Sequence, residues 1–383
     1  MKKRLVILGS TGSIGRSALD VASRHTDRIE IVGLSVHANI DLLAEQIRRF
    51  HPKYVAVTEP RAYDKLARSF NYPETRLLDF SEGIRFLTGL PEADVILNAI
   101  VGAAGLKASL DIVHSGKRLA LANKESMVIG GELINRVASK SRAEIVPVDS
   151  EHSAIWQALC SGRKREVKKI ILTGSGGPFR DLPLDKFKDI TREQALHHPT
   201  WNMGPKITID SATMMNKGLE IIEAMRLFDI PAEKIEVVIH PQSIIHSMVE
   251  FVDSSIIAQM SNPDMRLPIA YAIFFPERLP SANGRLDLMA AGKLEFYPPD
   301  YQKFPLLKLA FDVAARGGTV PAVYNAANEI AVEAFLNSAV EFVKIPEIVI
   351  NTVNKHEPIK NPSLDDILEA DRWARDTAIK QVG

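Results

Sequence analysis

Short apolar runs alternate with helix-like segments through the first 150 residues of the chain. The runs cover residues 4–8, 30–34, 54–57, 94–100, 118–122 and 144–148. Amphipathic stretches lie between them, for example residues 41–50 and 106–114. Strands that alternate with helices pair in parallel, and the helices then cover both faces of the sheet. The pattern predicts an α/β domain with a doubly wound parallel sheet over residues 1–150.

The turn after the first predicted strand is rich in glycine and reads Gly9-Ser10-Thr11-Gly12-Ser13-Ile14-Gly15. Glycine lets the backbone turn tightly and approach a pyrophosphate, whose charge then lies at the N-terminus of the next helix, here residues 14–24. The spacing differs from the commoner dinucleotide form, and a glycine turn without a ligand is the alternative. Its position between a strand and a helix favours a bound dinucleotide.

The end of the second predicted strand indicates which dinucleotide is bound. NAD sites usually place an acid there to bond the ribose 2′-hydroxyl. This chain reads Ser35-Val36-His37-Ala38-Asn39, which contains no acid. A 2′-phosphate meets no repulsion at such a position, so NADP is the favoured cofactor.

Charged side chains follow two later strands of the predicted sheet. Asp149 and Glu151 come directly after the run 144–148, and Lys124 follows the run 118–122. In open α/β sheets ligands bind beyond the carboxyl ends of the strands, so these side chains and the glycine turn share one edge. Two carboxylates at i and i+2 in extended backbone reach one hard divalent cation together. The alternatives are a strand end that caps a helix and a surface pair of Lys124 with Glu125.

A second region, residues 151–275, has three candidate segments. The loop Gly174-Ser175-Gly176-Gly177 follows the predicted strand 170–173 and offers N–H groups and a hydroxyl to a phosphate, although a plain structural turn is equally compatible. Residues 197–205 combine two prolines and a glycine with His198 and Trp201, which predicts a mobile lid over a pocket. A loop packed statically against the domain is the alternative.

The third segment is a predicted helix that contains residues 216–228, with Ser211 as its N-cap. Asn216, Lys217 and Glu220 lie on one face of this helix, while Leu219, Ile222, Met225 and Phe228 form the stripe for the core. An amide, an ammonium and a carboxylate on one face suit an anionic, metal-bound substrate. The alternative is an ordinary surface pair between Lys217 and Glu220.

The remaining segments predict architecture. Alternation over residues 245–257 indicates an antiparallel strand pair at an exposed edge, with structural roles for His240 and His246. Frequent prolines and weak periodicity between residues 275 and 305 indicate a connecting arm. Helical patterns over residues 306–316, 326–336, 346–354 and 363–380 predict a C-terminal α-helical domain.

Charge and cysteine content exclude several classes of function. Lys+Arg and Asp+Glu each total 47, so no global field favours nucleic acid or an anionic membrane surface. The one cysteine, Cys160, excludes an internal disulfide and a thiolate metal cluster, which suits a cytoplasmic location. The basic start, residues 1–4, precedes an apolar run too short for an export signal, and no segment has the length of a membrane span.

Six blocks carry a family resemblance: GSTGSIG (9–15), ANKES (122–126), PVDSEH (147–152), LTGSGGPFR (172–180), DSATMMNKGLE (210–220) and HPQSIIHSMVE (240–250). In this order and spacing they make the chain similar to the 1-deoxy-D-xylulose 5-phosphate reductoisomerase family of the non-mevalonate isoprenoid pathway. The likeness runs from Arg4 to the C-terminal helices. It implies a homodimer with a Rossmann-like NADPH-binding domain (1–150), a central α/β catalytic and dimerisation domain (151–275), a connecting arm (276–305) and a helical domain (306–383).

The resemblance also implies a set of site residues. The family's cofactor contacts match Thr11, Gly12, Ser13, Ile14, Asn39, Asn123, Glu125 and Gly204. Its divalent-metal carboxylates match Asp149, Glu151 and Glu220. Its substrate contacts match Lys124, Ser150, Glu151, Ser175, His198, Trp201, Ser211, Asn216, Lys217 and Glu220, of which Lys124 and the three carboxylates are the expected catalytic groups.

In the family a sugar phosphate, 1-deoxy-D-xylulose 5-phosphate, is rearranged and then reduced, with NADPH and Mg²⁺ or Mn²⁺ as cofactors. Two other hypotheses remain: a metal-independent NADP-dependent dehydrogenase of a small aldehyde or polyol, and a non-catalytic NADP-sensing protein. A metal-independent dehydrogenase would leave Asp149, Glu151 and Glu220 without a shared function. A non-catalytic NADP sensor would need no site for a hydride acceptor.

One departure from the family concerns the cofactor. Well-known members read glycine-lysine-asparagine where this chain reads His37-Ala38-Asn39, so the lysine that can neutralise a 2′-phosphate is missing. The resemblance therefore implies a narrower preference for NADPH over NADH than lysine-bearing relatives have.

Overall fold

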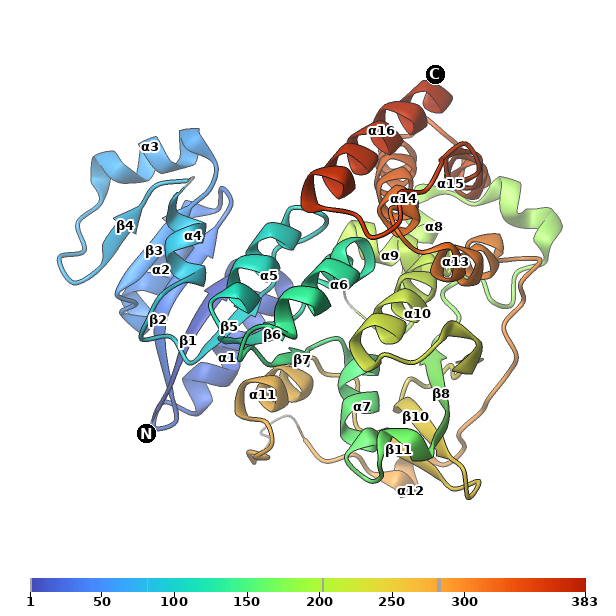
Figure 1. Ribbon diagram of the computed structural model, residues 1–383, viewed down its shortest axis with the longest axis horizontal. Helices are drawn as coiled ribbons and strands as arrows, with labels where there is room; N and C mark the ends of the chain where they lie inside the picture. Colours follow the sequence, from blue (N-terminus) through green and yellow to red (C-terminus); the bar gives the residue numbers. More distant parts are fainter. Residues whose placement is uncertain (1, 81, 202, 281–283) are drawn as a thin grey trace. The chain divides into compact units, whose positions relative to one another are not determined.

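The computed structural model describes residues 2–80, 82–201, 203–280 and 284–383. The chain forms two compact units (Figure 1). The first unit comprises Met1–Ser126, Ile134–Ser153 and Asp264–Gly284, and the second comprises Met127–Leu133, Ala154–Pro263 and Arg285–Gly383. Both units are assembled from segments distant in the sequence, and the predicted boundaries at residues 150, 275 and 305 stay predictions.

The first unit is built on a seven-stranded parallel sheet with the order β4-β3-β2-β1-β5-β6-β7. Its strands are β1 (Lys3–Leu8), β2 (Ile29–Val36), β3 (Tyr54–Val57), β4 (Arg76–Leu78), β5 (Val95–Asn98), β6 (Arg118–Leu121) and β7 (Ile145–Pro147). The central strand β1 is buried on both faces, since Leu5, Val6, Ile7 and Leu8 are all fully buried. The doubly wound sheet is confirmed, and the sequence had missed only the short edge strand β4.

Helices of the first unit connect these strands. They are α1 (Ser13–Arg24), α2 (Ile40–Phe50), α3 (Pro60–Ser69), α4 (Glu82–Thr88) and α5 (Gly105–His114), with both ends of α6 (Lys124–Ala138) and the first turn of α7 (Ser150–Leu159). A later helix, α11 (Arg266–Phe274), also belongs to this unit. Arg266 bonds Asp20 of α1 at 2.9 Å, and Arg118 of β6 donates to the carbonyl of Ile273 at 3.2 Å. These polar contacts hold α11 against the sheet domain.

The second unit has a four-stranded mixed sheet with the order β11-β10-β8-β9. The strands are β8 (Val167–Gly174), β9 (Ile235–Ile239), β10 (Ile245–Phe251) and β11 (Ile256–Met260). Strand β8 pairs in parallel with β9, and β10 is antiparallel to both β8 and β11. The predicted antiparallel pair over residues 245–257 is therefore present, with β11 as an exposed edge.

Helices make up most of the rest of the second unit. They are α8 (Arg192–Ala195), α9 (Pro205–Ala212), α10 (Met215–Phe228), α12 (Leu288–Ala291), α13 (Pro305–Arg316), α14 (Val320–Leu336), α15 (Lys344–Asn354) and α16 (Leu364–Val382). The last four confirm the predicted C-terminal helical segment. Helix α14 begins six residues before the predicted start at residue 326, because Pro321 favours the first turn of a helix, where no N–H bond is lost. Residues 281–283 of the predicted arm lie outside the described residues.

Ser211 is not the N-cap that the sequence suggested. It lies near the end of α9, which Pro205 starts, and α10 begins only at Met215. The N-cap of α10 is Met214, whose φ of 58° breaks the chain between the two helices. The prediction was wrong because it assigned one helix where a left-handed residue separates two.

Candidate functional site

The glycine turn of the first unit has the close packing that the sequence predicted. Gly9 has a φ of +83°, and a Cβ there would lie 2.7 Å from the carbonyl oxygen of Ala99. A Cβ on Gly15 would collide with the backbone of Gly9 and Ser10. Both positions therefore require glycine, because a side chain at Gly9 would push the turn away from the end of β5, and one at Gly15 would push α1 away from the turn.

The N-terminus of α1 is open for an anion. Gly12 is the N-cap, and among the described residues no side chain caps the first turn, which also carries no acid. Gly12 and Ser13 are exposed, and Thr11 and Ile14 are partly exposed. Backbone N–H groups and the helix dipole favour negative charge at such an end, so this turn fits a pyrophosphate.

The end of β2 presents three exposed residues, His37, Ala38 and Asn39. The Oδ1 of Asn39 accepts a hydrogen bond from the N–H of Leu42 at 3.2 Å, which caps α2 and leaves the amide group as a donor. Nδ1 of His37 lies 3.0 Å from Oγ1 of Thr58, at the end of the neighbouring strand. These polar groups surround the position expected for the ribose.

Asn123 and Glu125, two further predicted cofactor contacts, begin α6. Oδ1 of Asn123 accepts from the N–H of Ser126 at 3.0 Å, and its Nδ2 donates to the carbonyl of Gly102 at 2.9 Å. The same Nδ2 lies 3.1 Å from Oε2 of Glu125. Asn123 thus ties the loop after β5 to the loop after β6 and has a structural role of its own.

Lys124 and Asp149 meet at the carboxyl edge of the same sheet. Their Nζ and Oδ2 atoms lie 2.5 Å apart, and the side chains are only 10% and 14% exposed. Asp149 directly precedes α7, and in the first turn of that helix Oγ of Ser150 donates to Oε2 of Glu151 at 2.5 Å. Lys124 is therefore largely buried and pairs with Asp149, so it is not an ordinary surface lysine.

In the second unit, the glycine-serine loop after β8 holds Ser175 against His198. Oγ of Ser175 accepts from the N–H of Gly177 at 3.2 Å and lies 3.2 Å from Nε2 of His198. Nδ1 of His198 accepts from the N–H groups of Thr200 and Trp201 at 3.1 and 2.9 Å, so the proton of the neutral ring is on Nε2. Burial lowers the pKa of His198 below its ordinary value, which favours this neutral form.

The predicted face of α10 is buried. Nζ of Lys217 donates to the carbonyl of Thr173 at 2.5 Å and forms an ion pair with Glu220. Nδ2 of Asn216 lies 2.5 Å from Oε1 of the same carboxylate. Because the side chains of Lys217 and Glu220 are 4% and 1% exposed, the surface-pair alternative is wrong.

The remaining predicted substrate residues surround the same loop. A Cβ on Gly177 would lie 2.5 Å from the carbonyl oxygen of Ser211, so the loop and α9 are in contact. Trp201 is half-buried, with its ring centroid 6.3 Å from that of His246. Gly204 is the exposed N-cap of α9. Asn202, within the predicted lid, lies outside the described residues.

The predicted site residues thus form two groups, one in each unit. The first unit holds the glycine turn, Lys124 and the carboxylates Asp149 and Glu151, whereas the third predicted metal ligand, Glu220, belongs to the second unit. Sequence reasoning missed the role of Thr173, whose carbonyl oxygen accepts a hydrogen bond from Lys217. A backbone acceptor leaves no signal in the sequence.

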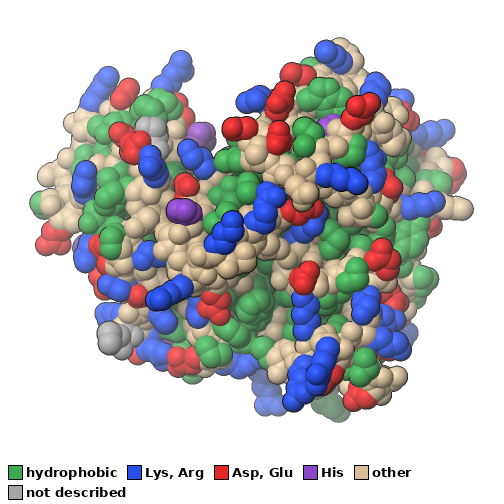
Figure 2. All heavy atoms as spheres, viewed as in Figure 1, with side chains coloured by type: hydrophobic (Ala, Val, Ile, Leu, Met, Phe, Trp, Pro, Cys, Tyr) green, Lys and Arg blue, Asp and Glu red, His purple; other side chains and the backbone are tan. Residues whose placement is uncertain are grey.

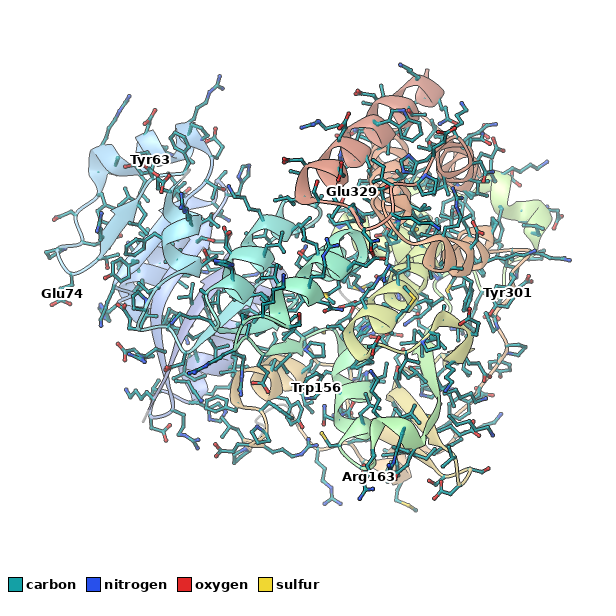
Figure 3. The ribbon with its side chains drawn as sticks, viewed as in Figure 1. Tyr63, Glu74, Trp156, Arg163, Tyr301 and Glu329 are labelled. Carbon is teal, nitrogen blue, oxygen red and sulfur yellow. The ribbon has the colours of Figure 1, made fainter. Side chains whose placement is uncertain are left out.

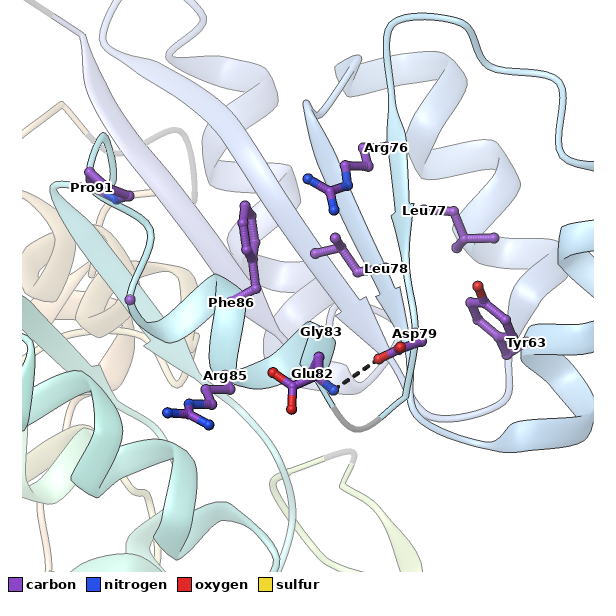
Figure 4. Close-up of a pocket in the computed structure, with 11 residues that line it drawn as sticks. Tyr63, Arg76, Leu77, Leu78, Asp79, Glu82, Gly83, Arg85, Phe86 and Pro91 are labelled. Carbon is purple, nitrogen blue, oxygen red and sulfur yellow. Dashed lines mark hydrogen bonds between the residues drawn. The ribbon is translucent and has the colours of Figure 1, made fainter.

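A pocket of about 600 Å³ lies elsewhere in the first unit, around β4 and α4 (Figure 4). Tyr63, Arg76, Asp79 and Phe86 are among its lining residues. Asp79 accepts from the N–H of Glu82 at 2.9 Å and so caps α4. None of the predicted site residues lines this pocket, and its balanced charges favour no ligand class.

Together, the doubly wound sheet with its open glycine turn and the buried polar group on β8, α9 and α10 define a dinucleotide-binding α/β oxidoreductase. Three family models match: 1-deoxy-D-xylulose 5-phosphate reductoisomerase at residues 5–131, the C-terminal domain of that enzyme at 145–228, and the DXP reductoisomerase C-terminal domain at 260–377. The chain belongs to the 1-deoxy-D-xylulose 5-phosphate reductoisomerase family.

Curated members of this family match the chain over its full length. The enzyme of Pelotomaculum thermopropionicum is 50% identical over 99% of this chain and 98% of its own. The enzyme of Thermodesulfovibrio yellowstonii is 50% identical over 100% of both chains.

Solved structures of the family agree with the fold. The Zymomonas mobilis enzyme in complex with NADPH is 41% identical, with a TM-score of 0.94 over 100% of this chain and 99% of its own. A reductoisomerase in complex with NADPH, fosmidomycin and magnesium is 40% identical, with a TM-score of 0.93 over 99% of this chain and 98% of its own.

No helix in the described ranges is long and apolar enough to cross a membrane.

Proposed function

We propose that this protein catalyses the NADPH- and divalent-metal-dependent conversion of 1-deoxy-D-xylulose 5-phosphate to 2-C-methyl-D-erythritol 4-phosphate in the non-mevalonate isoprenoid pathway. The observation that carries the proposal is the match to enzymes of this name, at 50% identity over essentially the whole chain. Similar solved structures with NADPH and with magnesium support both cofactors. The intact glycine turn and the buried polar group of the second unit support it further.

NADPH is proposed to bind along the first unit. Thr11, Gly12, Ser13 and Ile14 would hold the pyrophosphate at the open end of α1, and Asn39 would donate to the 2′-phosphate. The further predicted contacts are Asn123, Glu125 and Gly204. NADPH supplies the hydride that reduces the rearranged aldehyde.

The phosphate of the substrate is proposed to bind to Ser175, His198, Ser211, Asn216 and Lys217. The proposal rests on the packing of three elements, since the Ser175 loop contacts α9 and Lys217 of α10 bonds the end of β8. With its proton on Nε2, His198 donates toward Ser175 or an oxyanion beside it. Trp201 would cover the bound substrate as part of the flap.

Asp149, Glu151 and Glu220 are proposed to hold Mg²⁺ or Mn²⁺. Carboxylate oxygens are the ligands that these hard cations prefer, and Asp149 and Glu151 already lie within one turn of each other at the start of α7. The cation, when bound, polarises the substrate's C–O bonds and stabilises oxyanion charge. Lys124, paired with Asp149, would place a positive hydrogen-bond donor near the reacting oxygens, and Ser150 would position Glu151.

The decisive experiment follows NADPH oxidation with 1-deoxy-D-xylulose 5-phosphate, before and after chelation of divalent metal. We expect turnover that chelation abolishes and Mg²⁺ or Mn²⁺ restores. Turnover that survives complete chelation would favour the metal-independent dehydrogenase. Tight NADPH binding without any turnover, with metal present, would favour the NADP-sensing protein.

A homodimer is proposed to form through the second unit. Strand β11 lies at the edge of its sheet and, within the described ranges, pairs with β10 alone. Ile256 is 52% exposed and Ile257 is 36% exposed, and an exposed apolar edge strand readily pairs with another chain. Equilibrium sedimentation tests this: Ile257→Lys should shift the protein towards monomer, whereas Val101→Lys, at an exposed apolar residue of the first unit, should not.

The proposed location is the cytoplasm. An NADPH-dependent biosynthetic step and an exposed free thiol at Cys160 suit a reducing compartment. Charged side chains of both signs are interspersed over the face in Figure 2, in keeping with a small-molecule substrate and no nucleic-acid partner. Fractionation of cells that express the native chain tests this placement.

A further inference from the structure

Asp210 is a buried carboxylate that the proposed chemistry does not use. It lies on α9 directly before Ser211, and its exposed fraction is 1%. Nζ of Lys206, one turn earlier on α9, is 2.8 Å from Oδ2. Nδ2 of Asn328 donates to Oδ1 at 2.7 Å from helix α14, 118 residues further along the chain. These two contacts fix the position of Asp210, which suggests that it holds neighbouring site residues in place.

Helix α14 also meets α10 beside the proposed phosphate ligand Lys217. A Cβ on Gly218 would lie 2.5 Å from the hydroxyl oxygen of Tyr324 on α14 and 3.0 Å from Cβ of Ala310 on α13. That hydroxyl donates to the carbonyl of Leu306 at 3.0 Å, so the ring is fixed. The C-terminal helices therefore contact α9 and α10 next to residues that are proposed to bind the phosphate.

The two contacts differ in what they can determine. Packing at Gly218 determines how closely α10 and α14 approach each other. Such packing still allows a helix to rotate slightly about its axis. A hydrogen bond from an amide to a buried carboxylate is directional and charge-assisted, so it fixes the rotation of α9 about its axis. Ser211 follows Asp210 by one residue, and any rotation of α9 displaces its hydroxyl.

We propose that the Asn328–Asp210 hydrogen bond is a positioning contact that holds Ser211 in place for the phosphate of the substrate. The proposal rests on the proposed function, because Ser211 binds phosphate only there. Asp210 and Asn328 act through Ser211 and do not touch the substrate. Through Asn328, the C-terminal helical segment would contribute to substrate affinity as well as to the stability of the fold.

Asn325 provides a matched control on the same helix. It lies almost one turn before Asn328 and is equally buried, at 0% exposure. Its Nδ2 donates to Oε1 of Glu329 at 3.0 Å, within α14, and Glu329, which Figure 3 labels, in turn pairs with Arg375 of α16. Asn325→Ala therefore removes a buried amide of the same kind and keeps the Asn328–Asp210 hydrogen bond.

The test uses four variants of the full-length protein: Asn328→Ala, Asn328→Asp, Asp210→Asn and the exchange Asp210→Asn/Asn328→Asp. The exchange keeps one carboxylate and one amide with donor and acceptor reversed, whereas Asn328→Asp alone sets two carboxylates against each other. The measurements are KM for 1-deoxy-D-xylulose 5-phosphate, kcat, Tm and competitive inhibition by inorganic phosphate.

We expect KM and the phosphate inhibition constant to rise about tenfold in Asn328→Ala and more in Asn328→Asp, with kcat changed less than threefold. The exchange should recover part of the loss seen in Asn328→Asp, because it restores one amide and one carboxylate between the two helices but leaves Lys206 without its carboxylate partner at position 210. Asn325→Ala should leave KM within about twofold even if it lowers Tm. If Asn328→Asp does not fold, KM and the phosphate inhibition constant of Asn328→Ala test the positioning role.

Two results would overturn the positioning role. One is an unchanged KM in folded Asn328→Ala, and the other is an equal rise of KM in Asn325→Ala and Asn328→Ala. If the unmodified protein does not turn over substrate, the proposed function fails. The phosphate affinities of the same variants, measured by calorimetry, then still decide whether Asn328 positions the phosphate ligands.

Discussion

Lys124 and Asp149 form an ion pair, with 2.5 Å between Nζ and Oδ2, although they are 25 positions apart; Lys124 begins α6 and Asp149 directly precedes α7. The pair exists because β6 and β7 are neighbours in the sheet and both helices start at its carboxyl edge. Since both side chains are largely shielded from water, their attraction is stronger than that of a surface pair. Asp149, a proposed ligand of the cation, therefore also holds the ammonium of Lys124 at the same edge of the sheet.

Replacement of Asp149 by asparagine should reduce turnover by at least about 100-fold, because metal catalysis contributes several kcal/mol and each 1.36 kcal/mol is a factor of ten. NADPH affinity, measured by fluorescence titration, should stay nearly unchanged, since the dinucleotide is proposed to bind along the glycine turn. Glu151→Gln and Glu220→Gln should behave alike. Normal activity in Glu220→Gln would remove that residue from the mechanism.

Glu144 offers a control for these carboxylate variants. It precedes β7 at the other end of the strand and pairs with Arg118 at 2.7 Å, with 39% of its side chain exposed. Exposed ion pairs contribute at most about 1 kcal/mol. Glu144→Gln should therefore leave both turnover and metal dependence within about twofold of the unmodified protein.

A second prediction concerns the pH dependence of the His198 loop. Burial lowers the pKa of His198 in the folded protein below its unfolded value, so the neutral ring contributes stability that is fully present above the unfolded pKa of about 6.5. That contribution is lost as the pH falls through the folded pKa, because protonation of Nδ1 breaks the bonds from Thr200 and Trp201.

The measurement is the free energy of unfolding in urea between pH 7.5 and 5. The unmodified protein should lose more stability over this range than His198→Gln does. An NMR titration should also give His198 a pKa below 6.5 in the free protein. A pKa at or above 6.5 would contradict the lowering of the His198 pKa by burial.

The sequence was sufficient for the elements whose residues carry a periodic signal. Continuous apolar runs such as β1 report burial on both faces, and the last helices show regular apolar spacing. Strand β4 was missed because its three residues include the exposed Arg76, so neither alternation nor a buried run is visible. The separation of α9 from α10 at Met214 was missed since only φ reveals it.

The sequence proposes candidate site residues where they stand in motifs, but it gives no sign of the contacts that support them. Ser175, His198 and Lys217 stand in recognisable blocks. Their partners include the carbonyl of Thr173, and Asn328 supports α9 from 118 residues away. A contact of that separation depends on the packing of two helices, which a single sequence does not encode in any local pattern.

A third prediction treats Trp201 as a residue of the flap. Its side chain is half-buried, and the ring lies 6.3 Å from that of His246. Trp201→Ala should raise KM or lower kcat with little change in Tm. Truncation of a core tryptophan costs about 3–5 kcal/mol, so a Tm that falls by many degrees would support the statically packed loop instead.

The last prediction concerns the choice between NADPH and NADH. His37-Ala38-Asn39 is exposed at the end of β2 and lacks both an acid and a lysine. Oδ1 of Asn39 caps α2, so its amide group is the donor that remains for a 2′-phosphate. His37 already contacts Thr58 through Nδ1 at 3.0 Å, which leaves Nε2 as its second polar atom. NADPH should be preferred, by a narrower margin than in relatives that carry the lysine.

Ala38→Lys tests this directly, with Ala38→Gln as a neutral control of similar length. A charge-assisted contact to phosphate contributes roughly 1.5–3 kcal/mol, so the lysine should widen the NADPH preference by about tenfold or more. The gain should come from a lower KM for NADPH, with NADH unaffected. An identical ratio of kcat/KM for the two cofactors in the unmodified protein and Ala38→Lys would show that another basic group holds the phosphate.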